Sequence, residues 1–263
     1  MVNKHKKYKQ IPPKPASIDL IDSSKDGPIR FSIIASAIRT YNFPTMYNEL
    51  SKTQHNFEMV FAGNRGPVRG MDFRNFKYLY EEGSGAKCLE LCARVARGKY
   101  LIYIGDDYDI PNNFLDTIAK HQDGLYAEKS LFCFRYTRDG KEQPGCFTFD
   151  MTQPNSPMVG NCGVYDREKW LELGGVDKRF EMGLLDLDIM MRFFEVGYRV
   201  SIIPDFPLNE NRRQHSRSNY GLRTLSQGRE LLKRFWEKDG KLVKERQEPV
   251  MSYTDQELGL EKE

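Results

Sequence analysis

The chain has 263 residues, of which 39% are hydrophobic and 29% are charged. This composition is typical of a soluble globular protein and excludes wholesale disorder. The formal net charge is only +3, so overall basicity does not mark a nucleic-acid-binding protein. No apolar run approaches the roughly 18 residues that span a bilayer, and no signal-peptide core is present. We therefore expect no transmembrane segment and a cytoplasmic location, and the five cysteines agree because they lack metal-site spacing.

Residues 1–29 are predicted to form an irregular, basic leader. The segment contains four prolines, and five lysines precede the first acidic residue, Asp19. Such an arm is able to contact the phosphates of nucleic acid or lipid. A solvated terminus without a partner produces the same pattern, so both interpretations stay open.

The next hundred residues alternate between strands and helices. Because strands and helices alternate, we predict a parallel sheet with right-handed crossovers, in which ligands bind at the carboxyl ends of the strands. Ser36, Asn64 and Asp106 follow such ends. Cys88 and Cys92 lie four apart in a predicted helix, where core packing is the expected role. The predicted strands are Phe31–Ser36, Phe57–Ala62, Phe76–Tyr80 and Tyr100–Ile104, and the predicted helices are Asn48–Gln54 and Lys87–Arg97.

The second half has longer helical stretches. Leu187, Met190, Met191 and Phe194 recur at spacings of three, four and seven, which indicates a helix. After the last helix, residues 237–263 are charged, and we expect them to be loosely held. The predicted strands are Leu131–Tyr136 and Tyr198–Ile203, and the predicted helices are Arg167–Leu173, Asp186–Val196 and Leu222–Trp236.

An acidic tetrad, Asp106-Asp107-Tyr108-Asp109, directly follows an apolar strand. Three carboxylates within four residues repel one another unless a cation or basic groups compensate them. Mg²⁺ and Mn²⁺ take oxygen ligands of this kind and share them with substrate phosphates. An acidic turn in which Asp109 caps a helix near Pro111 gives the same pattern.

A second motif runs from Gly174-Gly175-Val176-Asp177-Lys178-Arg179-Phe180 to a helix that begins near Asp186. Asp186 and Asp188 flank Leu187 in its first turn, where the helix dipole favours carboxylates. Capping alone explains Asp188. A carboxylate held close to an acceptor hydroxyl also serves as a general base.

Taken in order, these motifs resemble those of family-two-type glycosyltransferases with the GT-A fold, within the nucleotide-diphospho-sugar transferase superfamily. The similarity spans Phe31 to Ser218 and includes the exit Gly197-Tyr198-Arg199-Val200 from helix to strand. It implies an α/β fold with a mixed, mainly parallel central sheet flanked by helices. The implied organisation is a leader at 1–29, a GT-A domain at 30–220 and a C-terminal helix with a charged tail at 221–263. Within the domain, residues 30–110 form the nucleotide-binding half and residues 111–220 the acceptor half.

The resemblance also implies roles for the acidic residues. Asp107 and Asp109 match the ligands of a Mn²⁺ or Mg²⁺ ion, and Asp106 lies nearer the nucleotide. Asp186 matches the general base, although Leu185 stands where the family has an acidic residue. Asp188 matches a later aspartate that is usually structural.

Further residues match positions that hold the donor. Ser36 and Arg39 fall where the family holds the nucleoside, and Lys87 falls where a basic or amide residue approaches it. Asn64 stands in place of an aspartate that reads the base, and it both donates and accepts hydrogen bonds. Asn161 falls where relatives build the sugar and acceptor pocket.

A late basic loop completes the predicted site. His215 falls where relatives have a histidine that ligates the metal or contacts the diphosphate. Arg212, Arg213 and Arg217 suit a pyrophosphate because guanidinium groups match phosphate oxygens. An exposed basic loop without a ligand is the alternative.

The resemblance implies an inverting, metal-dependent hexosyltransferase-like enzyme that moves a sugar from a nucleotide-diphosphate sugar, a UDP-sugar by preference, to an acceptor hydroxyl. The acceptor does not follow from the sequence: a glycan is one candidate, and a nucleic acid or other polymer held by the basic leader is the other. A nucleotidyltransferase and a non-catalytic binder of phosphate polymers are the remaining alternatives. Neither the sugar nor the oligomeric state follows from the sequence.

Overall fold

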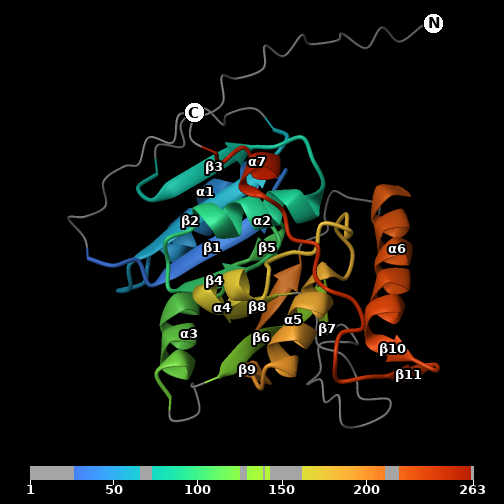
Figure 1. Ribbon diagram of the computed structural model, residues 1–263. Helices are drawn as coiled ribbons and strands as arrows, with labels where there is room; N and C mark the ends of the chain where they lie inside the picture. Colours follow the sequence, from blue (N-terminus) through green and yellow to red (C-terminus); the bar gives the residue numbers. More distant parts are fainter. Residues whose placement is uncertain are drawn as a thin grey trace, which may run out of the picture.

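A computed structural model of the chain describes residues 27–65, 73–124, 129–138, 140–142, 162–210 and 219–261. Within these ranges, one nine-stranded sheet runs in the order β3-β2-β1-β4-β8-β6-β9-β5, with β7 paired to β6 (Figure 1). None of the described helices is long and apolar enough to cross a membrane.

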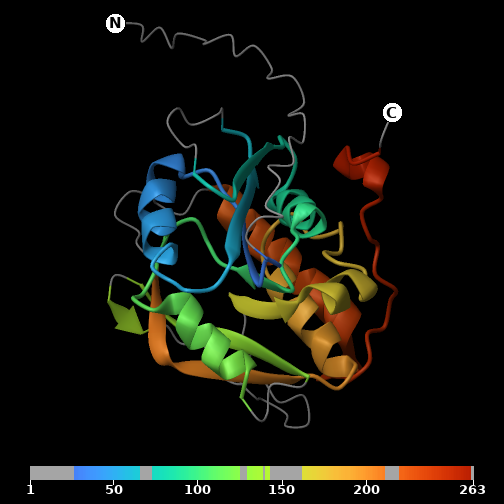
Figure 2. The same ribbon diagram turned by 90° about the vertical axis from the view of Figure 1, so that its left-hand side faces the viewer.

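The N-terminal half of the sheet is parallel, as predicted. Strand β1 (Phe31–Ser36) lies between β2 (Phe57–Gly63) and β4 (Tyr100–Tyr103), and β3 (Phe76–Tyr80) pairs with β2 at the edge. Because alternate residues of a strand face opposite sides, the sheet has two separate apolar layers. Helix α1 (Phe43–Leu50) packs in one layer and α2 (Gly85–Val95) in the other, so the two helices cover opposite faces of the sheet (Figure 2).

The strand direction changes in the C-terminal half. Strand β8 (Gly163–Asp166) is antiparallel to β4 on one side and to β6 (Ser130–Arg138) on the other. Strand β6 then pairs in parallel with β9 (Arg199–Glu210), whose end pairs with the short β5 (Tyr108–Asp109). The remaining elements of this half are α3 (Phe114–Gln122), β7 (Lys141–Glu142), α4 (Arg167–Glu172) and α5 (Leu185–Glu195).

Two elements differ from the sequence-based expectation in their extent. The helix predicted at Asn48–Gln54 begins earlier, because Phe43, Met46 and Leu50 form its buried stripe and Pro44 is accepted at its first turn. Strand β9 continues past Ile203 to Glu210 through a bulge opposite Phe134 and Arg135. The bulge lets the strand continue past Pro204.

The C-terminal region contradicts the expectation of a loosely held tail. Helix α6 (Asn219–Trp236) is followed by the hairpin β10 (Glu237–Lys238) and β11 (Lys241–Leu242). Residues 243–260, which we call the C-terminal strap, then cross α5 and reach α2, where α7 (Asp255–Leu258) ends the path (Figures 1 and 2). The strap is fixed because its charged side chains have buried partners and because Tyr253 and Leu258 join the core.

Candidate active site

Asp106 organises the loop that follows β1. Its side chain is 2% exposed, and its carboxylate accepts hydrogen bonds from the backbone N–H groups of Ile38 and Arg39, both at 2.6 Å. The Arg39 guanidinium also forms an ion pair with it, and Asn42 Nδ2 donates to its carbonyl oxygen at 3.0 Å. The carboxyl ends of β1 and β4 are therefore joined through one compensated, buried charge.

Asp107 has a different environment. Its side chain is 17% exposed, and Arg39 Nη2 lies 3.2 Å from its Oδ2. Burial raises the pKa of Asp107 to about 6; Arg39 opposes this rise, whereas the Asp106 and Glu210 carboxylates add to it. Hard divalent cations bind carboxylate oxygens, and the only cationic group that the structure pairs with Asp107 among the described residues is also paired with Asp106. The Asp107 side chain therefore suits the metal predicted from the sequence.

Asp109 lies at the opposite end of the acidic tetrad, on β5. It is exposed, and Asn209 Nδ2 on β9 donates to its Oδ2 at 2.7 Å. Asp109 also lines a polar groove of about 350 Å³ between α1 and the segment after β5. Among the described residues, no three His, Cys, Asp or Glu side chains are arranged as a metal site. Asp107 and Asp109 thus remain predicted ligands whose set would need phosphate oxygens, water or His215.

Asp186 acts electrostatically on residues at the same end of the sheet. It is half-buried in the first turn of α5, two residues after the N-cap Leu184, whose φ is +64°. Burial raises the pKa values of Tyr103 and Cys162 well above their ordinary range, and the charges of Asp186 and Asp107 both add to each rise. The charges of both carboxylates therefore act on the same buried pair, which lies where β4 ends and β8 begins.

Asp188 is held differently from Asp186, although it lies only two residues further along α5. Its side chain is 1% exposed, and it accepts hydrogen bonds from Arg192 Nε, Trp236 Nε1 and Arg246 Nε at 2.9 to 3.0 Å. The buried Asp188 carboxylate thus accepts hydrogen bonds from three different side chains. These contacts agree with the structural role expected for Asp188.

The predicted nucleoside residues lie around the ends of β1 and β2. Ser36 is the last residue of β1, and its hydroxyl forms a hydrogen bond with the Cys88 thiol of α2. Lys87, in the first turn of α2, forms an ion pair with Glu81 at 2.9 Å, and Asn64 is exposed just after β2. The structure thus joins Arg39, Asp106 and Asp107 by direct contacts and gathers the other three around the same strand ends. Asn161, Arg212, Arg213, His215 and Arg217 lie outside the described residues.

Sequence reasoning missed Glu210, whose charge acts on Asp107 from the end of β9. The signal was hidden because Pro204 and Pro207 interrupt the strand pattern that leads to it. A further missed feature is the close approach of α6 to the loop before Asp186. A Cβ on Gly183 would lie 2.6 Å from the Thr224 carbonyl oxygen, so two glycine positions, Gly183 and Gly228, let the backbones touch.

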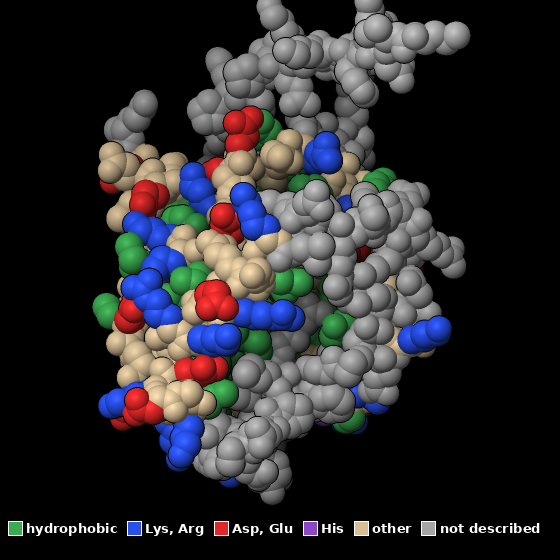
Figure 3. Space-filling model, turned by 90° about the vertical axis from the view of Figure 1, so that its right-hand side faces the viewer, with side chains coloured by type: hydrophobic (Ala, Val, Ile, Leu, Met, Phe, Trp, Pro, Cys, Tyr) green, Lys and Arg blue, Asp and Glu red, His purple; other side chains and the backbone are tan. Residues whose placement is uncertain are grey.

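Surface charge on the face that carries α6 is mixed. In Figure 3, the described lysine and arginine side chains alternate with acidic ones over this face. Arg223 pairs with Glu181, Arg234 with Glu248 and Lys233 with Glu230. The described part of this face therefore lacks a uniform basic surface.

No protein-family model matches the chain, and no curated protein matches it in sequence. Solved structures do match. The S. aureus TarS fragment 1–349 in complex with UDP-GlcNAc aligns with a TM-score of 0.56 and 16% identity, over 72% of this chain and 60% of that one. The chain has the fold of TarS.

Two further TarS structures agree. One aligns with a TM-score of 0.55 and 15% identity, over 70% of this chain and 37% of that one. The other, TarS 1–349, aligns with a TM-score of 0.55 and 13% identity, over 81% of this chain and 74% of that one. The present chain thus spans 60% of the TarS fragment crystallised with UDP-GlcNAc. The match to TarS confirms the GT-A fold expected from the sequence.

Proposed function

We propose that the protein is a glycosyltransferase that moves a sugar from a nucleotide-diphosphate sugar, preferably a UDP-sugar, to an acceptor hydroxyl with inversion. The observation that carries this proposal is that the charges of Asp107 and Asp186 act on the same buried pair, Tyr103 and Cys162, near the carboxyl end of β4. Ligands bind at this edge in open α/β sheets. Support comes from the shared fold with TarS, which was crystallised with UDP-GlcNAc.

The donor side is built by the loops after β1, β2 and β4. Arg39 supplies a guanidinium next to Asp107, and the α2 N-terminus lies beside Ser36 at the end of β1. Asp107, with Asp109 and His215, would hold Mn²⁺ or Mg²⁺. Such an ion, when bound, offsets the charge that develops on the leaving diphosphate.

The acceptor side is built by α5. Asp186 lies in its first turn, half-buried, and takes the proton of the acceptor hydroxyl as that oxygen attacks the anomeric carbon. The base needs a fixed position, because small displacements of reacting groups cost rate steeply. Neighbouring Asp188 supplies the anchor, since its carboxylate accepts hydrogen bonds from Trp236 of α6 and Arg246 of the strap as well as from Arg192 of α5.

The experiment that tests this function is a panel of nucleotide sugars incubated with and without Mn²⁺. We expect release of nucleoside diphosphate from at least one UDP-sugar, and proton NMR should show that the sugar first released has the opposite anomeric configuration to the donor. Release of pyrophosphate from a nucleoside triphosphate would instead indicate a nucleotidyltransferase. No turnover of any nucleotide sugar, in either condition, would contradict the proposal.

A further inference from the structure

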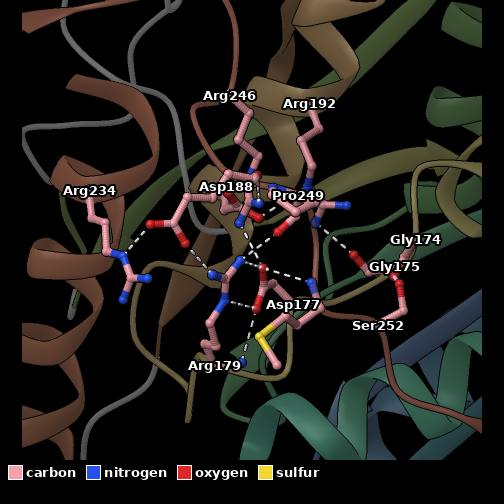
Figure 4. A network of polar contacts seen from close by, with 12 residues as sticks. Gly174, Gly175, Asp177, Arg179, Asp188, Arg192, Arg234, Arg246, Pro249 and Ser252 are labelled. Carbon is pink, nitrogen blue, oxygen red and sulfur yellow. Dashed lines mark hydrogen bonds and ion pairs between the residues drawn. The ribbon is translucent and has the colours of Figure 1, made fainter. Parts of the chain in front are cut away.

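The C-terminal strap places one arginine in the interior of the molecule. Arg246 has a side chain that is 4% exposed, and all three guanidinium nitrogens donate hydrogen bonds (Figure 4). Nη2 binds Asp177 Oδ2 at 2.7 Å, Nε binds Asp188 Oδ1 at 2.9 Å, and Nη1 binds the Glu248 carbonyl oxygen. A planar fork used in this way fixes the relative positions of its partners.

Those partners lie on both sides of Asp186. Asp177 belongs to the loop between α4 and α5, and Asp188 belongs to the first turn of α5. The backbone N–H of Arg246 also donates to Glu195 Oε1 at 3.0 Å, at the last residue of the same helix. One strap residue therefore contacts both ends of the helix that carries Asp186.

Helix α6 is tied to the same arginine. The Arg246 guanidinium lies over the Phe235 ring, 4.0 Å from its centroid, and the Arg179 guanidinium lies 4.1 Å from that centroid. Phe235 is fully buried, which strengthens such cation–π contacts. Arg179 in turn bonds Asp177 through Nε at 2.9 Å and Nη2 at 2.6 Å.

The glycine pair of the second sequence motif leaves room for this arrangement. Gly174 has φ of +89°, and a Cβ there would lie 2.7 Å from Ser252 Oγ of the strap. Ser252 Oγ donates to the Gly174 carbonyl at 2.8 Å, and Arg192 Nη2 donates to the Gly175 carbonyl at 2.6 Å. The two glycines therefore let the loop backbone approach both the strap, through Ser252, and α5, through Arg192.

We propose that Arg246 is a positioning residue for sugar transfer: it holds the first turn of α5, through Asp177 and Asp188, so that Asp186 meets the acceptor. The inference rests on the proposed function, in which Asp186 is the base. It adds the C-terminal strap to the acceptor side of the site through the contacts of Arg246 with Asp177 and Asp188.

The test uses the full chain with Arg246→Met, Arg246→Lys and the control Arg234→Met. Arg234 belongs to the same network through Glu248, but its side chain is 59% exposed. Calorimetry with UDP gives the affinity and the binding-competent fraction, and kcat is expressed per competent molecule. Hydrogen exchange of residues 184–190 reports on the start of α5 without any turnover.

For Arg246→Met we expect a UDP affinity within about twofold of the wild type and a KM for the donor that is likewise unchanged. We expect kcat to fall about 10- to 100-fold, the range for displaced catalytic groups, with faster exchange at 184–190. Arg246→Lys should recover part of kcat, since an ammonium keeps the charge but loses the fork. Arg234→Met should behave as the wild type.

The inference is overturned if Arg246→Met matches Arg234→Met in both kcat per competent molecule and exchange at 184–190. If Arg246→Met does not fold, Arg246→Lys carries the same comparison. An inactive wild type contradicts the proposed function instead, and the exchange data then decide by themselves whether Arg246 holds α5.

Discussion

Two clusters of this molecule use the same side-chain types and differ in how completely their carboxylates are paired. Around the strap, Asp177 and Asp188 are at most 1% exposed, and each receives several arginine donors. At the strand ends, Asp107 is 17% exposed and shares one arginine, Arg39, with Asp106.

The two clusters shift carboxyl pKa values in opposite directions. Burial raises the pKa of Asp107 to about 6. Burial also acts to raise the pKa of Asp177, but the hydrogen bonds from Arg179, the Met251 N–H and the charge of Arg246 outweigh it, so that this pKa is lowered. The fully paired carboxylates of Asp177 and Asp188 fix the chain, whereas Asp107, whose pKa is raised, is a candidate to bind a cationic ligand.

Removal of divalent cations should produce the largest effect, and only at the strand-end cluster. We expect EDTA to abolish sugar transfer, with Mn²⁺ or Mg²⁺ restoring it, because Asp107 is proposed to face the diphosphate together with the ion. The urea unfolding midpoint should be the same with and without EDTA, because the strap cluster is held by side-chain contacts and needs no cation. Full turnover in EDTA would remove the cation from the proposed mechanism.

Asp186→Asn should lower the rate of sugar transfer by about 10²–10⁴-fold, the contribution of one positioned general base. The substitution keeps the bulk of the side chain, so the affinity for the nucleotide sugar should stay close to that of the wild type. Steady-state kinetics with a donor-binding titration measures both. A folded Asp188→Asn variant with crippled transfer, beside a mild Asp186→Asn, would move the base to Asp188.

Asp188→Ala should mainly change stability. The truncation leaves Arg192, Arg246 and Trp236 without their buried acceptor, and breaking a buried pair in this way costs about 3–5 kcal/mol. Urea unfolding followed by circular dichroism gives the free energy. The control Glu172→Gln, whose side chain is 65% exposed, should keep the wild-type midpoint. Equal midpoints for the two variants would contradict the role assigned to the strap cluster.

Asp177→Asn should have the smallest effect, visible as a change in pH dependence. Because the pKa of Asp177 is lowered in the folded protein, its carboxylate contributes stability above its unfolded pKa, and this contribution is lost as the pH falls through the folded value. The wild type should therefore lose stability below about pH 4, and the Asn variant should lose less over that window while being less stable at pH 7. Parallel stability profiles would show that Asp177 carries no such linkage.

Local patterns predicted much of this fold. The apolar runs at Phe31–Ser36 and Phe76–Tyr80 are strands with those bounds, and the heptad-like spacing after Asp186 is helix α5. Each depends on residues close in sequence. Strand β8 and helix α3 were missed: β8 has only four residues, too few to establish a period, and α3 has a short buried stripe among polar residues.

Candidate site residues could be named from the sequence where a motif is local, as with Asp106, Asp107 and Asp186, and their roles stay predictions. Contacts were not predictable where partners meet across the chain. Arg246 lies 58 residues after Asp188 and 69 after Asp177, and it stands in a charged stretch that resembles a solvated tail. No local period reports that such an arginine is buried, since only the assembled core supplies its partners.

The distance along the chain between Arg246 and its partners has a consequence for biosynthesis. At about 5–20 residues per second, the ribosome completes Arg246 some 3 to 12 seconds after Asp188. Throughout that interval the nascent chain carries Asp177 and Asp188 without the one arginine, Arg246, that contacts both of them. The α4–α5 loop and the first turn of α5 therefore reach their final contacts only after Arg246 has been synthesised. Nascent chains arrested before Arg246 should be cleaved by protease between α4 and α5 more readily than chains arrested beyond α7.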